Sequence, residues 1–206
     1  MSYIFIIILF ALLAGIVSSI FQIPLWFISV LFIFIIIIRL GYILYMTYKS
    51  KDLAKLEKFL SNSKNPLHQL IYSYKDGSKE EQIKANETMI AKYNSPVVQG
   101  TYRANIAILN KDYKNAIQHA STIPNTALKN FTSAYVEALI GKKSNVAKYA
   151  IAQPWMKSLI AAIVAYRSKD METFEREKAK TLLNSKGIQY FENYYILENL
   201  QKIISK

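Results

Sequence analysis

The side chains that could carry out chemistry are few in this sequence. It has no cysteine, and its two histidines, His68 and His119, fall in different segments. A zinc site needs several nitrogen, sulfur or carboxylate ligands that converge, so both histidines would have to meet carboxylates from elsewhere in the fold. We therefore expect each histidine to be an ordinary helix residue, and we expect no metal and no other cofactor.

Carboxylates cluster at two places, Glu80-Glu81 and the group Glu172, Glu175 and Glu177. Each cluster follows a turn signal and falls in the first turns of a predicted helix, where the helix dipole stabilises negative charge. A catalytic carboxylate pair needs burial that separates the two pKa values, and the surrounding sequence does not indicate it. The six glycines are isolated, so no phosphate-binding loop is present. We expect no enzyme.

Charge divides the chain into two parts. Residues 3 to 48 contain one charged side chain, Arg39, whereas the rest of the sequence carries all the other charged side chains, and the full chain has a net charge of +12. The uncharged part holds two apolar runs, Tyr3–Ile20 and Leu25–Tyr48, and each is long enough as a helix to span a bilayer. Pro24 suits the first turn of the second helix. The pattern predicts a two-span transmembrane hairpin over residues 1–48.

Two alternatives remain open for the apolar part. A cleaved signal peptide would carry Lys or Arg near its start, and Met1 to Phe5 has neither. A buried pair of helices in a soluble core would show a polar face, and neither run has one. Arg39 is placed to snorkel to the nearer interface, although a functional charge within the membrane is the alternative.

The residues around the second span predict its orientation. Basic residues follow it, and the connection before it is uncharged, so the basic side should face the cytoplasm. Both termini of this cell-membrane protein would then be cytoplasmic. Anionic lipid headgroups could also contact the basic residues. The predicted interface anchors are Trp26, Arg39, Tyr42, Tyr45, Lys49 and Lys51.

The water-soluble part reads as an all-α array. Prolines and glycines fall where helices would begin and end, and no stretch alternates at period two. Residues 42–60 should continue the second span as one juxtamembrane helix, with 49–65 as a basic helix or linker, and residues 66–206 should form one domain. The expected helices are 66–75, 78–93, 96–110, 113–122, 125–140, 144–152, 154–168, 171–184 and 187–204, the last as an amphipathic capping helix.

The helices form pairs joined by polar turns that recur about every 30 residues, which is typical of a helical-hairpin repeat. In the unit Val97–Pro124, Lys111-Asp112-Tyr113 leads into a helix that opens with Ala116-Ile117. This turn, with the small residues Ala104, Ala107 and Ala120, resembles the tetratricopeptide repeat. The other three units are degenerate, and Gly100 stands where that family usually has a tryptophan. The resemblance implies an α-solenoid of such pairs.

The tetratricopeptide family binds peptides or proteins on the concave face formed by the first helices. Matching positions within the units give Asn105, Tyr135, Tyr166 and Arg167 as candidates for that face here. Asn105 matches an asparagine that clamps a terminal carboxylate in some members, but Thr101 stands where such members have a lysine. The alternative for all four is packing between helices or plain exposure.

Two function classes remain open. The first is a membrane-anchored adaptor or scaffold whose cytoplasmic domain binds a protein or peptide. The second is an accessory subunit whose hairpin packs on another membrane protein, for which Ala11, Ala14 and Gly15 offer a small-residue face. We expect no nucleic-acid partner, because the lysines are spread and interleaved with acids. The Ile-, Lys-, Asn- and Tyr-rich composition suggests a bacterial source.

Overall fold

The computed structural model describes residues 12, 15–16 and 18–204, and these form helices and connections without a strand. The chain divides into two units, Met1–Tyr45 and Met46–Lys206. The predicted first span, Tyr3–Ile20, lies largely outside the described residues, and so do Ala11 and Ala14. The two-span hairpin therefore stays a prediction.

Helix α2, Leu25–Tyr48, is the apolar helix that the second run predicted. Most of its side chains are exposed to the surroundings of the chain, with Phe27 51%, Ile33 55% and Leu40 53% accessible. Within the described part of the chain, one helix, Trp26–Tyr48, is long and apolar enough to cross a membrane. The exposure follows from its sequence, which offers no polar face to water and no amphipathic stripe to a core.

The expectation of one continuous helix over residues 42–60 is wrong. Helix α2 ends at Tyr48, and α3 spans Leu53–Ser61. After the break Asp52 caps α3, and its side chain accepts a hydrogen bond from the Lys55 backbone N–H at 3.1 Å. Ser50 is fully buried at the break, and its carbonyl accepts a hydrogen bond from Gly187 N–H at 2.7 Å.

The remaining helices follow the predicted order. They are α4 (Pro66–Asp76), α5 (Lys79–Lys92), α6 (Pro96–Leu109), α7 (Tyr113–Ser121), α8 (Thr126–Ile140), α9 (Lys143–Val146), α10 (Pro154–Arg167), α11 (Met171–Asn184) and α12 (Ile188–Ile204). Prolines open α4, α6 and α10, and Ser78 forms a capping box with Glu81 at the start of α5. The predicted helix 144–152 is only the single turn α9, followed by irregular backbone that leads to Pro154.

Consecutive helices pack against each other from α3 to α8 and again from α10 to α12, and α10 packs on α8. At the α6–α7 contact, Ala104, Ala116 and Ala120 are fully buried. A Cβ on Gly100 would lie 2.8 Å from Ile123 Cγ1, so a large side chain at this position would force the helices apart. These small residues allow the close approach that the resemblance predicted, without showing which family the helices belong to.

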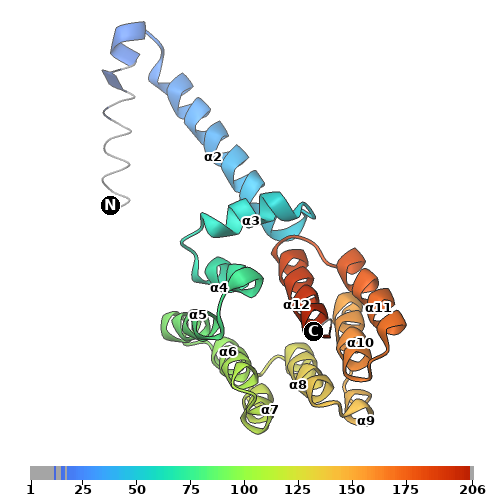
Figure 1. The fold of residues 1–206 in the computed structure, drawn as a ribbon. Coiled ribbons are helices and arrows are strands. Elements are labelled where there is room, and N and C mark those ends of the chain that lie inside the picture. The colour runs from blue at the N-terminus through green and yellow to red at the C-terminus, as the bar shows by residue number, and fades with distance from the viewer. Residues whose placement is uncertain (1–11, 13–14, 17, 205–206) are drawn as a thin grey trace. The chain divides into compact units, whose positions relative to one another are not determined.

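Helix α12 does more than close the end of the array. It packs on α10 and α11, and also on α3 and α4 at the start of the domain. In Figure 1 the helices α4 to α11 follow one another along a curve, and α12 lies on its inner side. Two side-chain interactions hold α12 against its neighbours. Asn199 Nδ2 of α12 donates to the Tyr74 carbonyl of α4 at 2.9 Å, and Lys178 of α11 pairs with Glu198 of α12 at 2.6 Å.

Candidate functional site

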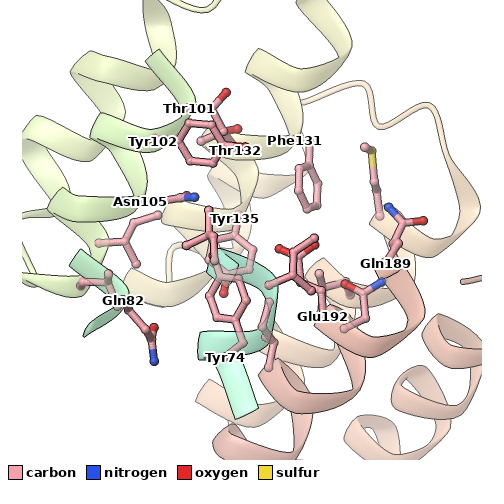
Figure 2. Close-up of a pocket in the computed structure, with 18 of the residues that line it drawn as sticks. Tyr74, Gln82, Thr101, Tyr102, Asn105, Phe131, Thr132, Tyr135, Gln189 and Glu192 are labelled. Atoms are coloured by element: carbon pink, nitrogen blue, oxygen red, sulfur yellow. The ribbon is translucent and has the colours of Figure 1, made fainter. Parts of the chain in front are cut away.

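A cavity of the helical domain lies between α12 and the helices that face it (Figure 2). Its volume is about 520 Å³, within the range of small-molecule sites. Most of the lining comes from five helices, and each of them contributes residues of one face, as the helical period requires. The lining residues are Leu67, Leu70, Ile71 and Tyr74 of α4; Thr101, Tyr102, Asn105, Ile108 and Leu109 of α6; Leu128, Phe131, Thr132 and Tyr135 of α8; Trp155, Met156 and Leu159 of α10; and Gln189, Glu192, Asn193, Ile196, Asn199 and Leu200 of α12.

The walls are mostly apolar, and a few polar groups interrupt them. Gln82 of α5 lies at one edge and Gln189 of α12 at another (Figure 2). The Thr101 hydroxyl is buried and has no hydrogen-bond partner among the described residues. Asn193 is already engaged, because its Nδ2 donates to the Ser185 hydroxyl at 2.8 Å. An apolar cavity with a small set of polar groups is the usual composition of a ligand site.

Glu192 is the single charged residue in the described lining of this cavity. Burial raises the pKa of its carboxyl to about 7, because the low-dielectric cavity disfavours the charged form. Its side chain, with those of Tyr74 and Tyr135, points from three helices into one central space (Figure 2). A carboxyl group that titrates near neutrality inside a cavity is the most distinctive electrostatic feature of the domain.

Three tyrosines line the same cavity as this carboxylate. Burial, followed by the charge of Glu192, raises the pKa of Tyr102 to about 12 and that of Tyr74 and Tyr135 well above the ordinary value. All three phenols are therefore neutral at physiological pH and keep their hydroxyl protons. They present aromatic rings and hydrogen-bond donors, and they do not add negative charge.

No protein-family model, curated protein sequence or solved structure matches the chain.

A second cleft of about 490 Å³ adjoins the cavity. The two share Leu67, Ile71, Trp155, Gln189 and Glu192. The cleft is also lined by Thr47 and Tyr48 at the end of α2 and by Lys186 before α12. The shared lining offers a route between the cavity and the surface of the domain.

Two of the four residues predicted for the concave face line the cavity. They are Asn105 of α6 and Tyr135 of α8. Tyr166 belongs to the last turns of α10, beyond the part that lines the cavity, and packs on Phe174 of α11 with ring centroids 6.3 Å apart. Arg167 is exposed at the end of α10. The structure does not bring Tyr166 or Arg167 to the cavity.

The predicted interface anchors lie in two settings. Trp26, Arg39, Tyr42 and Tyr45 are exposed along α2, and Lys49 is exposed after it. Lys51 has specific contacts in the helical domain, where its Nζ donates to the carbonyls of Leu182 (3.3 Å) and Leu183 (2.6 Å). A cation at these last carbonyls of α11 is favoured by the helix dipole.

Three of the residues first considered for chemistry, His68, Glu81 and Glu177, have structural contacts. His68 Nδ1 lies 2.8 Å from the Ser63 hydroxyl, and its ring packs on Phe59. Glu81 accepts a hydrogen bond from the Ser78 backbone N–H, and Glu177 pairs with Lys180 at 2.7 Å. Across the described residues, no group of three or more His, Cys, Asp or Glu side chains is placed to hold a metal ion.

Proposed function

We propose that this chain is a membrane-anchored adaptor that is not an enzyme, and that its helical domain recognises a partner by receiving one end or side chain of it in the cavity. The cavity between α12 and the helices that face it carries this proposal. Helix α12 lies along the inner side of the array and is fastened to α4 and α11. A partner peptide would therefore reach the cavity through the adjoining cleft, and would not lie along an open groove.

The anchoring half of the proposal is supported by α2, whose exposed apolar side chains have the length and composition of a membrane span. We extend it to a two-span hairpin with both termini in the cytoplasm, because basic residues follow α2. The tetratricopeptide-like character of the helix pairs belongs to the same proposal. It is supported by the buried alanines and close packing of α6 and α7.

A cavity-filling substitution tests the function. Leu128→Trp places a large ring in the cavity, whereas the matched Leu183→Trp places it on α11, where Leu183 is 71% exposed. We expect cross-linked partners of the full chain to be lost from membranes with Leu128→Trp and kept with Leu183→Trp. Partners that survive Leu128→Trp but disappear when residues 1–45 are replaced by an unrelated hairpin would contradict the adaptor and support the accessory subunit.

A further inference from the structure

We propose that the group received by the cavity is an organic ammonium ion on an apolar body, with Glu192 as its counter-charge and Tyr74, Tyr102 and Tyr135 as its aromatic surround. This inference rests on the proposed function, because it names the chemistry of the inserted group. The same chemistry occurs in the ammonium of a partner's lysine or N-terminus and in a free amine.

Charge is the first step of the argument. The lining contains Glu192 and no lysine, arginine or histidine among the described residues. No hydrogen bond to its carboxylate comes from any residue in the described part of the chain. A partly buried carboxylate among mostly apolar side chains is costly unless it is protonated or paired with a cation. A ligand that carries a positive charge would supply the missing partner.

The aromatic surround is the second step. Tyr74, Tyr102 and Tyr135 come from α4, α6 and α8, so three separate helices bring phenol rings to the space opposite α12 (Figure 2). The faces of aromatic rings attract cations, and desolvation strengthens this attraction. Neutral tyrosine hydroxyls can also donate to the Glu192 carboxylate once a ligand holds it ionised. Rings and carboxylate together favour an organic ammonium group.

Volume and lining exclude a simple metal cation as the occupant. Calcium takes six to eight oxygen ligands, and magnesium needs near-octahedral geometry, whereas this lining offers one carboxylate among mostly apolar side chains. A cavity of about 520 Å³ also has room for an apolar body beside the charged group. The walls formed by Phe131, Trp155 and Leu159 would bury that body.

The pKa of Glu192 depends on the charged and titratable groups around it. Helices α4, α6 and α8 present the three tyrosines, α10 presents no titratable side chain to the cavity, and Lys186 lies in the adjoining cleft. Lys75 pairs with both Glu57 and Asp76, and Lys178 pairs with Glu198, and none of these residues lines the cavity. Because burial places the pKa of Glu192 at about 7, ammonium binding should weaken as the pH falls through that value and the carboxylate is protonated.

Titration of the full chain in dodecyl maltoside, a detergent without an ammonium group, tests the proposal. The probe is benzyltrimethylammonium, and choline is compared with its neutral isostere 3,3-dimethylbutan-1-ol. We expect the two cations to bind and Glu192→Gln to weaken them at least about tenfold. Glu172→Gln, an exposed carboxylate on α11, should leave binding unchanged. Equal binding of choline and the neutral alcohol, equal affinity of Glu192→Gln, or Kd values weaker than about 1 mM for both cations would overturn the proposal.

Competition separates this proposal from the adaptor function. If a partner's own ammonium group occupies the site, benzyltrimethylammonium should displace the partner whose capture depends on Leu128. Probe binding that depends on Glu192, in a chain that loses no partner with Leu128→Trp, would keep the ammonium site, assign it to a free amine and contradict the adaptor. Partner capture that depends on Leu128, without any binding of the probe, would keep the adaptor and overturn the ammonium site.

Discussion

At the scale of single residues, Glu192 should make the free energy of unfolding depend on pH. Burial raises its pKa from 4.5 to about 7. Between these two values the folded chain holds a proton that the unfolded chain has lost, so this group makes the free energy of unfolding fall as the pH rises through that window. Above it, both states are ionised and the folded state bears the full cost of the buried charge, up to about 3 kcal/mol.

Glu192→Gln should therefore stabilise the chain at pH 8, by up to about 3 kcal/mol, and change it little at pH 5. The measurement is denaturant unfolding of the detergent-solubilised chain at a series of pH values, expressed as the difference between wild type and variant. This difference isolates Glu192 from groups such as Glu177, whose pKa is lowered by its hydrogen bond with Lys180. Glu172→Gln is the control, and a difference that does not change with pH would refute the buried charge.

At the scale of elements, the position of α12 depends on the turn that precedes it. Gly187 has φ +62°, and its N–H donates to the Ser50 carbonyl at 2.7 Å. A Cβ at this position would collide with the Thr47 carbonyl. Gly141, after α8, also has a positive φ of +86°, but open space surrounds the position of its Cβ. A comparison of substitutions at the two glycines therefore separates the cost of backbone strain from the cost of a collision of the added Cβ.

Gly187→Ala should destabilise the chain by more than 2 kcal/mol, roughly, through strain and collision together, whereas Gly141→Ala should lose only about 1 kcal/mol through strain. Thermal unfolding of both variants in the same detergent measures the difference. Equal losses would show that the chain after α2 does not hold the start of α12. Since α12 forms one wall of the cavity, Gly187→Ala should also weaken any cavity ligand.

The helices also show how much of the fold and of the cavity could be predicted from the sequence. Proline and capping residues placed α4 to α8 and α10 to α12 within a few residues, because those signals act locally. The break at Ser50–Asp52 was missed because it depends on burial of Ser50 beneath Gly187, a contact distant in sequence. Asn105 and Tyr135 were found from repeat spacing. Glu192 was missed because α12 was expected to bury one face, whereas Phe191 faces the core and Glu192 the cavity.

At the scale of the whole molecule, the charge division leads to a topology that labelling can test. The sequence has no cysteine, so single cysteines report one position each. We choose Ser2→Cys near the start of the sequence, Ser19→Cys between the two apolar runs, and Ala91→Cys, which is exposed on α5 and outside its cap. An impermeant thiol reagent applied to intact cells reaches only the positions that are exposed on the extracellular side of the membrane.

A two-span hairpin with a cytoplasmic domain predicts that Ser19→Cys is labelled in intact cells, and that Ser2→Cys and Ala91→Cys are labelled only after permeabilisation. The physical reason is that Lys and Arg after α2 are retained on the cytoplasmic side, whereas the uncharged connection crosses. Labelling at both Ser2→Cys and Ser19→Cys would leave α2 as a single span. Labelling at Ala91→Cys in intact cells would place the cavity outside the cell and contradict a cytoplasmic adaptor, because its partner would then have to be extracellular.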